Sequence, residues 1–275
     1  MLIKLITKVF LRQDQSLTHM DPRNSTITIT YGDRAENHAG MQQIGEAKSV
    51  GFTVAELVGI RDHFHKYNVK CELIDLNAAT KEKTDEAAIL IIRRGVDVLM
   101  GAGAADSFFK EQANLNHDKK FLHYGKVANK KARYNLCFSN ESQEPDYAAG
   151  KGRIIPFRDV VFLSTLRDRL SQFFGPKAAG MVAEGNYYYD VNTCYINFHG
   201  DSERSMVIAV RLGCDMPLYY QWFHNSKPIG DIIKLILSHG DIYIMSQKAV
   251  GTDWKTRRFP TLRHAAGLEK NVEFK

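Results

Sequence analysis

Apolar and polar residues follow patterns that divide the chain into two parts. In the first part, a strand is predicted over 25–30, where Thr and Ile alternate, and a helix over 53–67. Thr53 and Glu56 stand at the two positions of a reciprocal capping box at the start of that helix. Further elements are expected along this part, with a strand at 69–76, helices at 84–94 and 105–113, and an apolar stretch at 96–100. Residues 1–119 are therefore predicted to form a mixed α/β region.

The second part, residues 120–275, starts with basic, aromatic and turn-forming residues and then becomes rich in short strands. The segment 120–155 is expected to contain irregular structure and short strands and to form a substrate-facing cover. Residues 157–174 have apolar side chains at helical spacing and end at Gly175-Pro176, a stop signal for a helix. Short β-rich segments then follow at 185–189, 193–198, 206–212, 218–223, 232–237 and 241–245. The pattern predicts the α+β class, with a double-stranded β-helix (jelly roll) as the catalytic core.

Composition adds a charge preference to this picture. The chain has 275 residues, a net charge of +6 and a pI near 9.0, which favours a polyanionic partner such as nucleic acid; the alternative is a merely basic surface. The longest apolar runs are far shorter than the roughly 18 to 20 residues of a membrane span, so no membrane partner is expected. Residues 1–10 lack the pattern of a secretory signal, and the four cysteines show no paired spacing. An intracellular location, cytoplasmic or nuclear, is expected.

Two histidines and one aspartate are the candidate metal ligands. His199 and Asp201 follow a predicted strand, and residues i and i+2 of an extended segment project to the same face. Such a pair is common by chance, but His264 comes sixty-three residues after Asp201, beyond several more predicted strands. Two histidines and one carboxylate on one side of a metal leave neighbouring positions open for a cosubstrate and oxygen. This arrangement is typical of non-haem Fe(II) oxygenases.

Around these three residues, the chain from about 120 to the end resembles the AlkB-like branch of the Fe(II)/2-oxoglutarate dioxygenases. That branch has an Asn-x-Tyr before its His-x-Asp, a hydrophobic strand ending in Leu-Gly after it, and then a Gly-Asp step between hydrophobic residues. The chain has these motifs in the same order, at Asn186-Tyr187-Tyr188, at 207–213 and at 237–245. The resemblance implies that the metal is Fe(II) and that Asn186 and Tyr188 help to hold 2-oxoglutarate.

The end of the chain departs from the pattern of that family. The family closes with a strand reading Arg-x-Asn-x-(Ser/Thr)-x-Arg, and its two arginines serve the carboxylates of 2-oxoglutarate. In the corresponding segment here, Asn271 matches, Lys275 replaces the last arginine, and the first arginine is absent. Lys275 is the candidate for the distal carboxylate, with Lys270 and Arg263 behind it. A cosubstrate other than 2-oxoglutarate stays open.

The resemblance implies an enzyme that hydroxylates a substrate carbon while it converts 2-oxoglutarate to succinate. Hydroxylation of an N-methyl group leads to loss of the methyl group as formaldehyde. The expected function is therefore hydroxylation or oxidative demethylation of a methylated nucleobase in DNA or RNA. Two alternatives stay open: a protein side-chain hydroxylase with the same cofactors, and a nucleic-acid-binding module that has lost catalysis.

Candidate substrate-binding residues fall in three places. Glu203 follows Asp201 by two residues, where it could accept a hydrogen bond from an exocyclic amine. The predicted cover interleaves cations with tyrosines, a combination that binds phosphate while it stacks on bases. The candidates in the cover are Tyr124, Lys130, Lys131 and Arg133. Arg257 and Arg258 form a second basic cluster shortly before His264. For each of these segments the alternative is a solvated, purely structural role.

Overall fold

The larger sheet of the protein has eight strands. A computed structural model describes residues 24–273 and places these strands in the order β4-β5-β15-β12-β1-β10-β8-β9. Every neighbouring pair is antiparallel except β8 and β9, which are parallel. In the same order, the strands are β4 (Cys71–Asp75), β5 (Ala88–Ile92), β15 (Ile242–Met245), β12 (Val207–Gly213), β1 (Thr26–Gly32), β10 (Val182–Tyr188), β8 (Tyr134–Ser139) and β9 (Ile154–Pro156).

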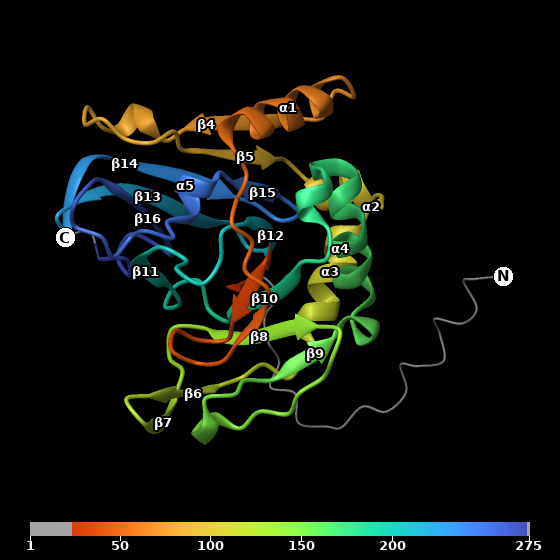
Figure 1. Ribbon diagram of the computed structural model, residues 1–275. Helices are drawn as coiled ribbons and strands as arrows, with labels where there is room; N and C mark the ends of the chain where they lie inside the picture. Colours follow the sequence, from red (N-terminus) through yellow and green to blue (C-terminus); the bar gives the residue numbers. More distant parts are fainter. Residues whose placement is uncertain (1–23, 274–275) are drawn as a thin grey trace.

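A smaller, four-stranded sheet packs against the larger one. Its order is β11-β16-β13-β14, and all its neighbouring pairs are antiparallel. The strands are β11 (Ile196–His199), β16 (Thr261–Ala266), β13 (Met216–His224) and β14 (Lys227–Leu237). In Figure 1 this sheet lies on the left of the molecule.

Alternating side chains of the larger sheet build two hydrophobic cores. In β5, Leu90 and Ile92 belong to a core shared with helices, whereas Ile89 and Ile91 belong to a core shared with β13 and β16. Successive side chains of a strand point to opposite faces, so a strand covered on both faces is apolar throughout. The helices are α1 (Val54–His65), α2 (Gly95–Met100), α3 (Ala104–Ala113) and α4 (Val161–Phe174), and Figure 1 shows α2, α3 and α4 on the side away from the smaller sheet. None of the helices within 24–273 combines the length and apolar character of a membrane span.

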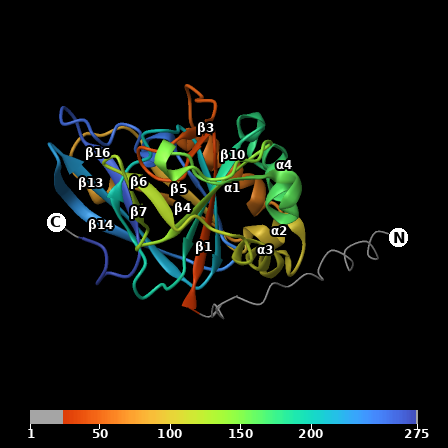
Figure 2. The ribbon, with the colours of Figure 1, turned by 90° about the horizontal axis from the view of Figure 1, so that it is seen from below.

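Short elements complete the fold. Two small ribbons are formed by β2 (Arg34–Glu36) with β3 (Gln43–Gly45) and by β6 (Lys120–His123) with β7 (Lys126–Asn129). Single helical turns are α5 (Gln247–Val250) and the 3-10 turns at Asn77–Ala79, Tyr147–Ala149, Phe157–Asp159 and Pro176–Ala178. The β6–β7 ribbon lies beneath the sheets in Figure 1 and faces the viewer in Figure 2.

Several predicted helices are confirmed. The Glu56 backbone N–H donates to the Thr53 hydroxyl at 3.1 Å, and the Thr53 backbone N–H donates to the Glu56 carboxylate at 2.8 Å, so the capping box of α1 is formed. α3 covers the predicted helix at 105–113. α4 lies within the predicted helix at 157–174 and ends before Gly175.

The predicted helix at 84–94 is wrong. Residues 88–92 form β5 instead, and the apolar stretch at 96–100 that follows lies in helix α2. All five residues of β5 are buried between layers, and its three β-branched isoleucines suit a strand that is covered on both faces. A short apolar run has the same periodicity in a buried strand and in a buried helix, so spacing alone does not separate them.

The α+β class is confirmed, and most of the regular structure is strand in two sheets, an arrangement compatible with a β-sandwich. The predicted division at residue 120 does not separate two sheets. β1, β4 and β5 come before it, yet they share the larger sheet with β10, β12 and β15. β1 even lies between β10 and β12, which follow it by 150 residues or more along the chain. Pairing over such a distance leaves no local signal in the sequence.

The end of the chain also differs from the prediction. Residues 267–273 form turns rather than the start of a closing strand. The segment 1–10, which was predicted to lack a secretory signal, and Lys275, the candidate for the distal carboxylate, lie outside the described residues.

Candidate metal centre

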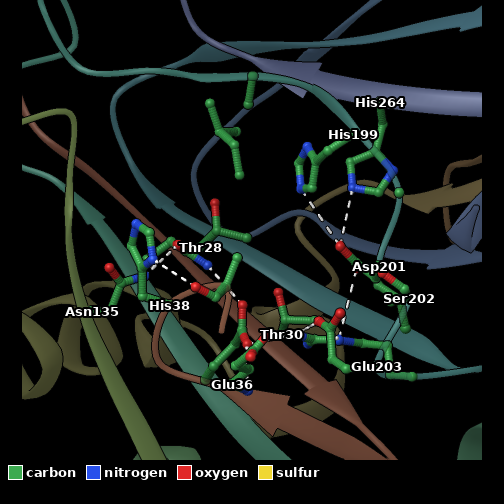
Figure 3. A pocket seen from close by; sticks show the side chains of 18 of the residues that line it. Thr28, Thr30, Glu36, His38, Asn135, His199, Asp201, Ser202, Glu203 and His264 are labelled. Atoms are coloured by element: carbon green, nitrogen blue, oxygen red, sulfur yellow. Dashed lines mark hydrogen bonds and ion pairs between the residues drawn. The ribbon is translucent and has the colours of Figure 1, made fainter. Parts of the chain in front are cut away.

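The three predicted metal ligands come together at one edge of the smaller sheet. His199 ends β11 and faces His264 of β16 as its partner in the strand register, while Asp201 follows two residues after β11. Asp201 Oδ1 lies 3.5 Å from His199 Nε2 and 3.6 Å from His264 Nε2, and one ligand atom from each residue falls within 4.8 Å of the others. Figure 3 shows the two imidazole rings turned toward the carboxylate. Three side chains from two neighbouring segments could therefore hold one metal ion.

The charge states of these side chains suit metal binding. His199 Nδ1 lies 2.8 Å from the carbonyl oxygen of Asn197, so Nδ1 carries the proton and Nε2 is left with its lone pair toward Asp201. Burial, and then the charge of His264, lowers the pKa of His199 to about 3. Burial alone would favour protonated Asp201, but Arg204 and then His264 hold the pKa of its carboxyl below the usual value. A neutral imidazole and an ionised carboxylate need to release no proton to a binding cation.

Glycine at position 200 lets the ligand loop lie against the chain that follows β15. A Cβ on Gly200 would lie 2.0 Å from the carbonyl oxygen of Gly251 and 2.9 Å from the Cβ of Trp254. The neighbouring Asp201 N–H donates to the carbonyl oxygen of Val250 at 3.0 Å. Close backbone contact therefore fixes the position of Asp201, and a side chain at 200 would prevent it.

The triad lines a cavity of about 680 Å³ between the two sheets. The floor of this cavity includes a row of polar residues that are register partners across four strands. Asn135 in β8 faces Asn186 in β10, Asn186 faces Thr28 in β1, and Thr28 faces Arg211 in β12. Figure 3 shows Thr28, Thr30 and Asn135 across the cavity from the three ligands. The cavity thus joins a metal-ligand wall to a polar floor.

Arg204 connects the metal ligands to this floor. It is 3% exposed, and its guanidinium bonds to Glu184 at 2.5 Å and to Glu203 at 2.6 Å, with Asp201 at 3.8 Å. Glu184 in turn accepts a hydrogen bond from the Asn186 amide at 3.0 Å. One buried cation therefore holds three carboxylates in place beside the candidate metal position. No pattern in the sequence singled out Arg204, although it directly follows the predicted Glu203.

A loop before β3 closes one side of the cavity. Glu36, Asn37 and His38 line it, and the Glu36 carboxylate accepts a hydrogen bond from the Gly40 N–H at 2.9 Å. Burial, and then the charge of Glu203, raises the pKa of Glu36 to about 7. Burial lowers the pKa of His38 to about 4. This loop is rich in polar residues and glycine, and such composition is the only sequence signal for its place at the cavity.

The predicted cofactor-binding residues are only partly at this cavity. Asn186 and Tyr188 line it, although the Asn186 side-chain oxygen already accepts hydrogen bonds from Arg133 and Asn135 at 2.7 Å each. Asn271 does not line the cavity, and its amide donates to the carbonyl oxygen of Asn192. Because residues 267–273 form turns, Asn271 does not take the place that the family pattern implied.

The predicted substrate-binding residues divide into three groups. Glu203 and Arg133 line the cavity. Lys130 does not reach the solvent as a phosphate-binding cation would. It is 8% exposed, and its ammonium donates to the Asn37 and Asn135 side chains at 2.7 Å each. The remaining four lie outside the cavity on the surface: Tyr124, which is 94% exposed between β6 and β7, and Lys131, Arg257 and Arg258.

The fold and the site together define a two-sheet α+β protein with a His-Asp-His group that could bind a metal ion. No family model matches the chain. The chain is 46% identical over 252 residues to an uncharacterized protein of Acanthamoeba polyphaga mimivirus, and the match covers 90% of this chain and 98% of the viral protein. The chain therefore belongs to the same family as this mimivirus protein.

Proposed function

We propose that the protein is an Fe(II)- and 2-oxoglutarate-dependent dioxygenase that acts on a methylated nucleobase in DNA or RNA. The observation that carries this proposal is the group of His199, Asp201 and His264 on one wall of a cavity. Within residues 24–273, no fourth histidine, cysteine or carboxylate belongs to this group. A structural zinc site is closed by a fourth protein ligand, whereas a catalytic site keeps positions open for substrate. The site therefore favours catalysis.

The donor set fits Fe(II). Two imidazole nitrogens and one carboxylate oxygen are the ligands typical of non-haem iron oxygenases, and no thiolate is present that would favour zinc. When bound, Fe(II) and 2-oxoglutarate supply the chemistry by which O₂ converts a substrate C–H to C–OH while 2-oxoglutarate becomes succinate and CO₂. The protein contributes the position of the ligands: Asn197 orients His199, and Arg204 keeps Asp201 ionised.

The arrangement of strands supports a double-stranded β-helix core. Four consecutive strands of the larger sheet, β10, β1, β12 and β15, face the smaller sheet: β10, β12 and β15 share a hydrophobic core with it, and β1 lines the cavity between the two sheets. We assign these eight strands to the jelly roll. In this assignment β1 supplies, from the start of the described chain, the strand that the family pattern predicted at 269–275.

Surface charge supports a polyanionic substrate. Lys119, Lys120 and Lys126 are exposed on or beside the β6–β7 ribbon, and Tyr124 projects from its turn. Lys255 lies at the cavity, and Arg257 and Arg258 are exposed close to it in sequence. Lysines and arginines neutralise phosphates, and an exposed aromatic ring stacks on bases. A base would enter the cavity from a single strand or after extrusion from a duplex.

Anaerobic titration with Fe(II) and 2-oxoglutarate tests the cofactors. We expect a weak visible charge-transfer band in the wild type and in His224→Ala, a matched control at a half-buried histidine of the same sheet, and no band in His264→Ala. With O₂, a methylated oligonucleotide should then release formaldehyde and a methylated peptide should not. Bound iron without a band would refute the 2-oxoglutarate assignment, and release from the peptide alone would identify a protein substrate.

A further inference from the structure

Arg211 is a buried cation in the floor of the cavity. It lies in β12, is 1% exposed, and its strand neighbours Val210 and Leu212 belong to the core beneath the helices. Because side chains alternate along a strand, Arg211 points to the opposite face together with Val207 and Ala209, which pack between the two sheets. There it lines the same cavity as the three metal ligands. A charged residue inside an apolar strand is the sequence signal that would have identified it.

Two nitrogens of this guanidinium, Nε and Nη1, are buried and have no hydrogen-bond partner among the described residues. Arginine stays protonated in proteins, and a buried unpaired charge is strongly unfavourable. The carboxylates of this region are already paired. Asp241, whose carbonyl oxygen accepts the Arg211 backbone N–H, binds Arg93 at 2.6 Å, and Glu184 binds Arg204. The charge of Arg211 is therefore available to an anion that enters the cavity.

Side chains with hydroxyl groups line the cavity near this charge. Thr28 faces Arg211 in the strand register and is 6% exposed, and Tyr188 and Tyr243 also line the cavity. Burial raises the pKa of both tyrosines, and the opposing effect of Arg211 does not cancel this rise, so both remain neutral hydroxyl donors. A planar guanidinium with hydroxyl donors beside it matches the two oxygens of a carboxylate.

We propose that Arg211 binds one carboxylate of a small dicarboxylate, together with Thr28 and Tyr243. The other end of this dicarboxylate reaches the metal ligands. The inference rests on the proposed function and identifies the residues that hold its cosubstrate. It moves this role from the end of the chain, where Lys275 was the candidate, to the centre of the larger sheet. The ligand class is a short 2-oxo dicarboxylic acid, because a single carboxylate would leave either the metal side or Arg211 unfilled.

The test compares 2-oxoglutarate with pyruvate, a 2-oxo acid that lacks the second carboxylate, by anaerobic titration of the full-length Fe(II) protein. In the wild type, 2-oxoglutarate should bind more tightly than pyruvate. Arg211→Met should weaken the binding of 2-oxoglutarate by about 10- to 100-fold, the range of a charge-assisted hydrogen-bonded pair. The binding of Fe(II) and of pyruvate should stay unchanged. Arg211→Lys should recover only part of the loss, since lysine lacks the planar fork.

The melting temperatures of the variants without ligands give a second measurement that does not depend on enzyme activity. Arg211→Met should melt at or above the temperature of the wild type, because it removes an unpaired buried charge. Arg93→Met is the matched control: it should lower the melting temperature, because it leaves the buried Asp241 carboxylate without its ion-pair partner, and it should not change the preference for 2-oxoglutarate.

Three results would count against the inference, and each leads to a different conclusion. If the wild type and Arg211→Met bind 2-oxoglutarate equally, Arg211 does not bind the carboxylate and the proposed function stands. If the wild-type Fe(II) protein binds no 2-oxoglutarate, the proposed function fails and the inference fails with it. If Arg211→Met unfolds at a lower temperature than the wild type in the absence of ligand, the guanidinium supports the fold instead.

Discussion

Gly200→Ala should abolish metal binding while the protein still folds, and it does so without removing any of the three ligands. The added Cβ would meet the Gly251 carbonyl oxygen at 2.0 Å, and real Cβ atoms do not come closer than 3.0 Å to such a neighbour. Both sides of this contact are backbone, so the ligand loop and residue 251 must move apart by about 1 Å. Metal–ligand distances tolerate deviations of about 0.2 Å. The shift is therefore several times larger than His199 and Asp201 can absorb while they bind one ion with His264.

The stability effect should be moderate by comparison. Overpacking of this kind typically costs about 1–3 kcal/mol, which corresponds to a fall of roughly 2–12 °C in melting temperature for a chain of this size. Metal binding stabilises a folded protein by mass action, so the wild type should melt at a higher temperature with Mn(II) or Fe(II) than with a chelator. In Gly200→Ala this metal-dependent rise should be lost, while the cooperative unfolding transition remains.

Gly59→Ala is the matched control. Gly59 lies in α1, and a Cβ there meets nothing within 4 Å. The substitution should raise stability by about 0.5–1 kcal/mol, because alanine loses less backbone entropy in a helix, and it should keep the metal-dependent rise. The reasoning is refuted if Gly200→Ala shows the same rise with metal as the wild type, since the contact with Gly251 would then not position the ligands.

Three further predictions concern the surroundings of the cavity. The pKa of Glu36 is raised from 4.5 to about 7, mainly by burial, so the folded state keeps a proton that the unfolded state loses. Stability should therefore fall as the pH rises from about 4.5 to 7, and melting curves of Glu36→Gln should show a smaller fall; an unchanged slope would contradict this. Lys130→Met should leave the side-chain oxygen of Asn37 without its hydrogen-bond donor, and hydrogen exchange should rise at 36–40; unchanged protection would show that Lys130 does not hold the loop. Arg257→Ala with Arg258→Ala should weaken oligonucleotide binding and reduce its salt dependence, at unchanged melting temperature; an unchanged salt slope would place the phosphates elsewhere.

The candidate metal ligands could be predicted because their residue types and order can be recognised in the sequence without knowing which strands pair. Only Gly200 separates His199 from Asp201 in the sequence, and His264 follows after several more predicted strands. The physical basis was only partly correct, because Asp201 lies beyond the end of β11 and reaches the histidines through a tight loop. What joins the two histidines is the register of β11 with β16, which no local pattern encodes.

The end of the cavity where we propose that the cosubstrate binds could not be predicted in the same way. The alternation of Thr and Ile at 25–30 indicated a strand but not its neighbours, and its position between β10 and β12 depends on pairing across most of the chain. The prediction therefore placed the last binding strand at 269–275, where its described residues form turns. For Lys130, basic composition suggested an exposed phosphate contact, whereas the structure gives it buried amide partners.

A buried polar group lowers stability unless it is hydrogen-bonded, and Thr28 in the polar row of the larger sheet gives a final test of this cost. Thr28 points into the cavity, and Ile29, its neighbour in β1, is fully buried beneath the helices. Thr28→Val exchanges a hydroxyl for a methyl group of nearly the same size, so it should raise the melting temperature without ligand and weaken the binding of 2-oxoglutarate. Ile29→Val should lower stability by about 0.5–1.5 kcal/mol and leave binding unchanged. A fall in stability for both variants would mean that the row supports the fold, whereas opposite signs at adjacent positions of one strand would favour a row kept for its ligand.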